Sequence, residues 1–147
     1  MIKVINFEPV HMMNIEKRDA DSEIAVFMGD MDKRAVAYAE AGRAVTMMDG
    51  EEILAVGGII KFWNGVGECW MMVSPEGRKH GYLLYKHMDG FIEACKQKWG
   101  YHRIQASVVE GNRAAHQCAY ELGFIPEGMM IHYGPHKENF VRYVQFA

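Results

Sequence analysis

The sequence predicts an α/β (α+β) fold in which helices pack on a mixed sheet. Short runs of strand-forming residues are bounded by turn residues, and Asp49-Gly50 and Asn64-Gly65 join three of these runs into an antiparallel meander. Apolar residues recur at helical spacing in segments between the later runs. The order is strand, helices, three strands, helix, strand, helix and two strands, which favours a single domain over residues 1–147.

The expected strands are apolar or alternating runs that end at Gly, Pro, Asn or Asp. They cover residues 2–7, 43–49, 53–63, 66–73, 102–109, 124–132 and 139–146. The first of them ends near Pro9, and Gly134-Pro135 marks the turn between the last two.

The helical segments are recognised by their 3.6-residue period and by their caps. Residues 11–42 form the first, more polar region, with expected breaks at 19–21 and 29–30 and an apolar face made by Ala35, Val36, Tyr38 and Ala39. A second helix follows residue 82 and ends at Gly100. A third is capped by Asn112 and stopped by Gly123.

Composition and charge exclude several classes of protein. A formal net charge of −3 argues against a general nucleic-acid binder, which needs a clustered basic face. Apolar runs such as residues 53–60 are too short to cross a bilayer, and the N-terminus lacks the apolar core of a signal peptide. We therefore expect a cytoplasmic protein with no membrane or nucleic-acid partner.

Cysteine and histidine spacing predicts neither a disulfide framework nor a metal site. Cys69, Cys95 and Cys118 are an odd set without a short pairing. The seven histidines include no H-x-x-x-H or similar ligand pair.

A polar, glycine-containing turn over residues 74–82 carries the main functional signal. It lies between a strand and a helix, where the first helical amides lack internal partners and the helix dipole favours negative charge. Arg78 and Lys79 add cationic side chains, and Gly81 allows close backbone approach. We expect the turn from Glu76 to Tyr82 to hold a pyrophosphate. A solvated basic turn is the alternative interpretation.

This turn resembles the phosphate motif of the GNAT family of N-acetyltransferases. The family motif is R/Q-x-x-G-x-G/A, commonly preceded by V-x-P, and Val73-x-Pro75 followed by Arg78-x-x-Gly81 matches most of it. Leu83 occupies the last small position, so it puts side-chain bulk where the family brings backbone close to its cofactor.

A second segment, residues 112–124, is similar to the family's N-x-x-A-x-x-x-Y-x-x-x-G-F helix. Asn112 and Gly123 match, although both are equally explained as helix caps. Ala119 stands where the family has tyrosine. Tyr120 follows one residue later, which rotates its side chain by about 100°.

The resemblance spans roughly residues 43–146 and implies a GNAT-like twisted sheet of about seven mostly antiparallel strands, with helices on both faces. It also implies acetyl-CoA as acyl donor, with the pantetheine arm between strand 66–73 and its parallel neighbour 102–109. The residues that it assigns to the cofactor are Trp70, Met71, Met72, Val73, Arg78, Lys79, His80, Gly81, Tyr82 and Asn112.

The implied activity is transfer of an acetyl group from acetyl-CoA, by direct attack, to an amine of a small molecule, peptide or protein. Glu68 is the candidate base, because many family members carry a base on this strand, and Tyr120 is the candidate acid. His116, one helical turn earlier, is a further candidate acid. The alternative interpretation is an outward-facing strand residue for Glu68, a packed aromatic for Tyr120, and a surface or capping histidine for His116.

Leu83 and Ala119 keep a second function open, namely a GNAT-fold protein without turnover that serves as a binding or structural component. The segment 134–140 is similar to short GNAT-like proteins of tailed bacteriophages, some of them virion-associated. The sequence leaves open both the identity of the acceptor and a homodimer.

Overall fold

The computed structural model describes residues 1–16 and 31–147. Its elements are β1 (Ile2–Asn6), α1 (Pro9–Asn14), α3 (Met31–Glu40), β2 (Ala44–Asp49), β3 (Glu52–Trp63), β4 (Val66–Val73), α4 (Pro75–Arg78), α5 (Gly81–Gln97), β5 (Arg103–Val109), α6 (Arg113–Glu121), β6 (Ile125–Met130) and β7 (Phe140–Phe146). The expected helix breaks at 19–21 and 29–30 lie outside the described residues.

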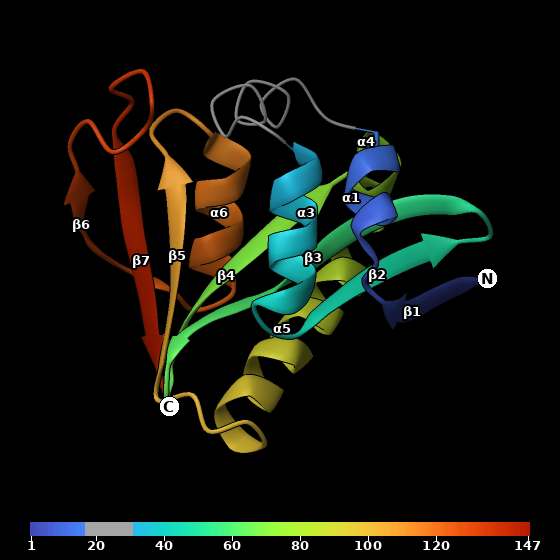
Figure 1. The fold of residues 1–147 in the computed structure, drawn as a ribbon, viewed down its shortest axis with the longest axis horizontal. Coiled ribbons are helices and arrows are strands. Elements are labelled where there is room, and N and C mark those ends of the chain that lie inside the picture. Colours follow the sequence, from blue (N-terminus) through green and yellow to red (C-terminus); the bar gives the residue numbers. More distant parts are fainter. Residues whose placement is uncertain (17–30) are drawn as a thin grey trace. The chain divides into compact units, whose positions relative to one another are not determined.

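The strands form one seven-stranded sheet in the order β1-β2-β3-β4-β5-β7-β6 (Figure 1). The pairs β1–β2, β2–β3, β5–β7 and β6–β7 are antiparallel, whereas β4 runs parallel to β5. The predicted mixed, mostly antiparallel sheet is therefore confirmed. By internal contacts the chain divides into a first unit, residues 1–60 and 70–84, and a second unit, residues 61–69 and 85–147.

In the first unit, α1 and α3 lie over β2 and β3 and close an aromatic core (Figure 1). The Trp70 ring lies 5.3 Å from that of Phe7 and 4.6 Å from that of Tyr38, so strand and helix meet through aromatic contacts. Each large apolar side chain buried in this way contributes about 1.5–3 kcal/mol. The prediction that Val36 belongs to the apolar face is wrong, because Val36 is 46% exposed while its neighbour Ala35 is buried.

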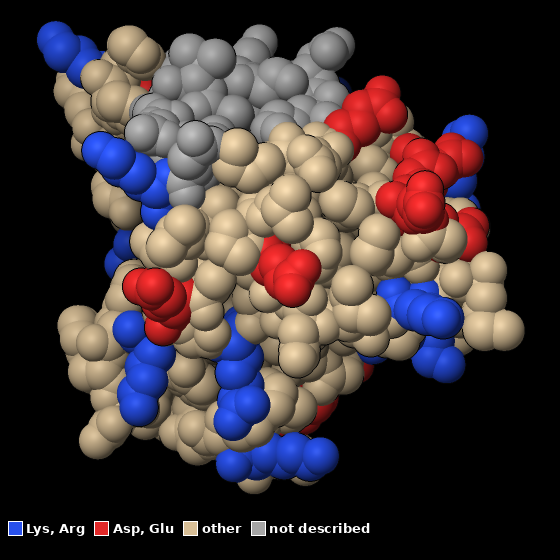
Figure 2. All heavy atoms as spheres, turned by 45° about the vertical axis from the view of Figure 1, so that its right-hand side comes forward, with Lys and Arg blue, Asp and Glu red and all other residues tan. Residues whose placement is uncertain are grey.

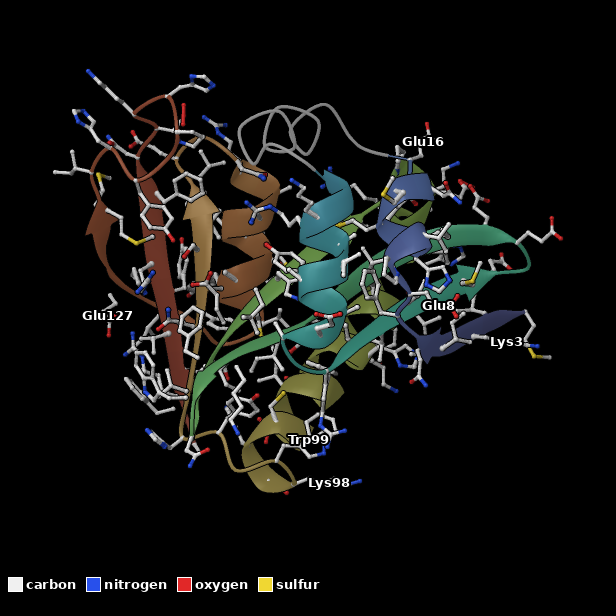
Figure 3. The ribbon with its side chains drawn as sticks, viewed as in Figure 1. Lys3, Glu8, Glu16, Lys98, Trp99 and Glu127 are labelled. Carbon is white, nitrogen blue, oxygen red and sulfur yellow. The ribbon has the colours of Figure 1, made fainter. Side chains whose placement is uncertain are left out.

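Local signals explain how α1 begins. Pro9 is its first residue, a position where proline loses no helical hydrogen bond. Glu8, labelled in Figure 3, precedes it, and its backbone N–H donates to Nδ1 of His11 at 3.0 Å. The same nitrogen lies 2.8 Å from Oγ1 of the buried Thr46 on β2, which ties the helix to the sheet.

In the second unit, β5 pairs with β4 on one side and with β7 on the other. The parallel ladder includes the pairs Val66↔Arg103, Gly67↔Ile104 and Glu68↔Gln105. The turn before β4 places Gly65 at a φ of 82°, and its carbonyl accepts the amides of His102 and Arg103. A left-handed conformation is natural for glycine, which explains why Asn64-Gly65 was a sound turn signal.

Basic and acidic side chains both lie on the face drawn in Figure 2, with uncharged surface between them. Among the described residues, no helix is long and apolar enough to span a membrane.

Candidate functional site

The predicted phosphate turn forms a helical turn of its own, α4, in the first unit. Ser74 caps it: its buried hydroxyl accepts the Gly77 amide at 2.9 Å, and Pro75 occupies the first helical position. The amides of Arg78 and His80 donate to the carbonyls of Ser74 and Gly77, respectively. The expectation that these amides were free for a ligand is therefore wrong, because Ser-Pro starts a helix here.

The helix entrance that a phosphate could meet lies later, where α5 begins at Gly81. The first backbone bond of α5 runs from the Leu84 amide to the His80 carbonyl at 3.0 Å. The amides of Gly81 and Leu83 come before this bond, in the positions where a helix offers donors to an anion. The last part of the predicted segment keeps its role as a candidate cradle.

The two cations of the turn differ in their environment. The Lys79 ammonium lies 2.9 Å from the Glu76 carboxylate, and this hydrogen bond raises the pKa of Lys79. Arg78 is exposed, and no residue that the structure describes forms an ion pair or hydrogen bond with its guanidinium. Arg78 is therefore the cation of this turn that no described residue pairs.

The two glycines of the turn, Gly77 and Gly81, differ in the space around them. Gly77 is buried against Leu54, and a methyl group at this position would collide with the Leu54 carbonyl oxygen. A methyl group on Gly81 would meet nothing within 4 Å, so the backbone there faces open space. Tyr82 is 77% exposed and Leu83 is half-buried, so the bulk of Leu83 does not fill the space beside Gly81.

The cofactor strand residues alternate along β4. Trp70 and Met72 pack against the aromatic core of the first unit, whereas Met71 is 37% exposed. Val73 is buried. The Trp70 indole Nε1 is buried and has no hydrogen-bond partner among the described residues, a feature that no sequence pattern predicts.

In the second unit, Glu68 lies at the centre of a polar cluster that crosses β4, β5 and β7. Its Oε1 accepts hydrogen bonds from Ser107 Oγ at 3.0 Å and from Gln105 Nε2 at 3.2 Å. Arg142 Nη2 lies 3.8 Å from the same oxygen. No described residue hydrogen-bonds to Oε2, so one oxygen orients the carboxylate and the other is left for a ligand.

Sequence reasoning singled out Glu68 but missed the three residues around its carboxylate, which are Gln105, Ser107 and Arg142. Arg103, Gln105 and Ser107 occupy alternate positions on β5, so the polar–apolar alternation of that strand was an available signal. Arg142 stands opposite Ser107 on β7, a pairing set by strand register rather than by local sequence.

Helix α6 of the second unit carries the remaining candidates. Asn112 is its N-cap and accepts the Ala115 amide at 3.2 Å, as the capping interpretation predicted. Ala119 is buried, whereas Tyr120 is 74% exposed, so the one-residue shift turns the tyrosine away from the core.

His116 on α6 is neither a surface nor a capping residue. Its Nε2 lies 3.1 Å from the Val109 carbonyl, which can only accept, so this nitrogen carries a proton. Its Nδ1 lies 2.7 Å from the Tyr143 hydroxyl. Because both nitrogens are engaged, we do not assign the acid role to His116.

A nucleophilic cysteine does not fit the second unit's strand β4. Burial, followed by the nearby Cys95 and Glu68, raises the pKa of Cys69 far above the ordinary thiol value. The thiol therefore stays protonated at neutral pH and is a poor nucleophile. Acyl transfer through Cys69 is therefore disfavoured.

Comparison with known proteins places this geometry in context. A spermidine N-acetyltransferase (SpeG) chimera from Vibrio cholerae and hSSAT superimposes with a TM-score of 0.76 at 16% identity, covering 99% of this chain and 95% of that one. A GNAT-family acetyltransferase from Bacillus anthracis gives 0.75 at 14% identity, covering 99% and 94%. A ribosomal-protein-S5-alanine acetyltransferase from Vibrio fischeri gives 0.70 at 14% identity, covering 99% and 92%.

These structures share the fold with this chain. No curated protein sequence matches it. The model of the acetyltransferase (GNAT) family matches residues 11–124, which include the phosphate turn, Glu68 and the whole of α6. The chain belongs to the acetyltransferase (GNAT) family.

Proposed function

We propose that this protein transfers an acetyl group from acetyl-CoA to an amine by direct attack. The observation that carries the proposal is the arrangement of Glu68, whose Oε1 is fixed by Ser107 and Gln105 while no described residue bonds to Oε2. A carboxylate held in this way suits a general base, because its orientation is set before the proton is transferred.

The first unit offers fitting residues for the acyl donor. The guanidinium of Arg78 and the first amides of α5, at Gly81 and Leu83, suit a pyrophosphate, and the open space at Gly81 admits it. Lys79 is a weaker contributor because Glu76 already pairs with it. We assign the backbone of Trp70 to Val73 to the pantetheine arm. Acetyl-CoA would supply an activated thioester at this place.

Glu68 answers the main chemical need of the acceptor. An alkyl amine with a pKa near 10.4 is only about one part in 10³ neutral at pH 7, and only the neutral form attacks. Oε2 of Glu68, directly or through a water, accepts the proton as the C–N bond forms and the C–S bond breaks. The leaving thiol, with an ordinary pKa of about 8.5, departs as thiolate and takes its proton from Tyr120 or water.

The family and the fold leave the acceptor open. The names of the similar structures describe acetylation of spermidine in one case and of a ribosomal-protein alanine in another. Those acceptors differ in size and charge, so the acceptor of this protein has to be read from its own residues.

A binding assay and a turnover assay together test the proposal. Acetyl-CoA and CoA at 100 times Kd should stabilise the protein by about 2.7 kcal/mol, seen as a higher melting temperature. Release of free thiol with a panel of amines then supports transfer.

The exposed Tyr120 beside the buried Ala119 favours one second candidate, a family member that binds CoA without turnover. Binding without thiol release on any amine would support this candidate. Absence of binding would overturn both.

A further inference from the structure

Arg142 on β7 carries hydrogen-bond donors that the described part of the protein does not use. Its Nη2 lies 3.8 Å from Glu68 Oε1, an ion-pair distance that is too long for a hydrogen bond. Its Nε is buried without a partner among the described residues, and its side chain keeps 27% of its surface exposed. The guanidinium of Arg142 therefore lies beside the proposed base Glu68, and some of its N–H donors have no partner among the described residues.

Arg103, the other arginine on this face of the second unit, provides the contrast. It donates to both oxygens of Glu127, at 2.8 and 2.6 Å, and to Gln105 Oε1 at 3.1 Å. These bonds raise the pKa of Arg103 and lower that of Glu127. Glu127 lies on the edge strand β6 and is labelled in Figure 3. The Arg103–Glu127 pair is therefore satisfied internally, and Arg142 is the arginine that can bind a ligand.

The charge balance of this cluster does not suit a polycation. Its two carboxylates, Glu68 and Glu127, are matched by Arg142 and Arg103. An acceptor with several ammonium groups would find no surplus negative charge here and would meet the partly exposed guanidinium of Arg142. An acceptor that brings a carboxylate together with its amine would complement both Glu68 and Arg142.

We propose that Arg142 binds the carboxylate of the acceptor, and that the acceptor is a small amino acid. This inference rests on the proposed N-acetyltransferase function and names its acceptor class. The carboxylate pairs with the guanidinium through charge-assisted hydrogen bonds. The amine lies at Glu68 Oε2, and because Glu68 and Arg142 are neighbours, only a short chain separates amine from carboxylate.

The arrangement divides the two ends of the acceptor between two side chains. Arg142 holds the carboxylate, and Glu68 accepts the proton from the amine. Arg142 is a binding residue in this scheme, and Glu68 remains the base.

Matched acceptor pairs test the inference. Each amino acid is compared with its decarboxylated amine, alanine with ethylamine and serine with ethanolamine, and spermidine is included as a polycation. The rate of thiol release at saturating acetyl-CoA gives kcat/KM for each acceptor. This value is calculated from the concentration of the acceptor's neutral amine form. One charge-assisted interaction of about 1.5–3 kcal/mol predicts a preference for the amino acid of about 10- to 100-fold.

Variants locate the preference. Arg142→Met should bring the ratio within each pair close to one, and Arg142→Lys, which keeps the charge but loses the fork, should give an intermediate ratio. Arg113→Met, which replaces an exposed arginine on α6, is the control and should leave the ratio unchanged. If Arg142→Met fails to fold, as judged by its melting curve, the Arg142→Lys ratio decides.

The outcomes separate this inference from the proposed function. The acceptor class would be overturned by any of three results: equal rates within each pair, faster reaction of the decarboxylated amines or of spermidine, or a preference that remains in both Arg142→Lys and Arg142→Met. N-acetyl transfer itself would stand in all three cases. No thiol release with any amine would overturn the proposed function, and the inference would fall with it.

Discussion

Ser107 Oγ lies 3.0 Å from Glu68 Oε1 and donates a hydrogen bond to it across the parallel pair β4–β5. Because Gln105 donates to the same oxygen, the two side chains determine which carboxylate oxygen is left to act. The proposed base is therefore positioned by residues of the neighbouring strand rather than by its own.

Replacing Glu68 tests this arrangement. Glu68→Gln should lower kcat by about 10²- to 10⁴-fold at neutral pH, because the acceptor loses its base. The loss should shrink for acceptor amines of low pKa, which are already neutral, and binding of acetyl-CoA should not change. Glu93→Gln, in an exposed pair with Lys96 on α5, is the control and should leave kcat unchanged. An equal loss for basic and weakly basic amines would contradict the role.

Ser107→Ala should act through Glu68. We expect a fall in kcat of up to about 10-fold, with little change in the KM for acetyl-CoA, because the carboxylate loses one of two bonds that orient it. In a Glu68→Gln background, the same substitution should have no further effect on kcat. Additive losses in the double variant would show that Ser107 acts independently.

Charge reversal at Arg78 tests the phosphate turn. Arg78→Glu should weaken CoA binding by at least about 10-fold, since an unpaired guanidinium is replaced by a repelling carboxylate. Lys79→Glu changes the charge by the same amount at the neighbouring position. This substitution should weaken CoA binding less, because Lys79 is already paired with Glu76. Calorimetric titration with CoA measures both. Equal effects would assign the binding to general charge rather than to Arg78.

Two glycine substitutions separate packing from ligand approach. Gly77→Ala should destabilise the protein by about 1–3 kcal/mol, because the added methyl group collides with the Leu54 carbonyl. Gly81→Ala should leave stability nearly unchanged but weaken CoA binding, because the space beside Gly81 is open to a ligand. Melting curves and CoA titrations of both variants check this. The assignment would be reversed if the Gly77→Ala variant folded stably and bound CoA more weakly while the Gly81→Ala variant bound CoA normally.

Local sequence signals predicted the fold, but they predicted only part of the candidate site. Asp49-Gly50 and Asn64-Gly65 were decisive because both glycines adopt positive φ angles of 62° and 82°, which turn chemistry anticipates. Ser74-Pro75 carried an equally local signal for α4, but we interpreted the segment as a turn with free amides. Arg142 beside Glu68 could not be predicted, because their proximity depends on the register of β4, β5 and β7.

The Arg103–Glu127 pair gives a pH-dependent contribution to stability. The hydrogen bonds from Arg103 hold the pKa of Glu127 below its ordinary value of 4.5, so the folded state binds the proton less readily than the unfolded state. The stabilisation is therefore fully present above about pH 5 and is lost as the pH falls through the lowered folded-state value. Because the pair is exposed, its contribution is small and weakens with added salt.

Glu127→Gln should accordingly lower the melting temperature slightly at pH 7 and low salt, and the difference from the unmodified protein should fade as the pH is lowered from about 5 to about 2. Thermal unfolding across this range measures the difference directly. Glu121→Gln is the control and should show no such fading, because among the residues that the structure describes its exposed carboxylate accepts from Gln117 alone. A destabilisation that persists at the lowest pH would mean that Glu127 stabilises the β6 edge through packing, because a protonated carboxylate no longer pairs with Arg103.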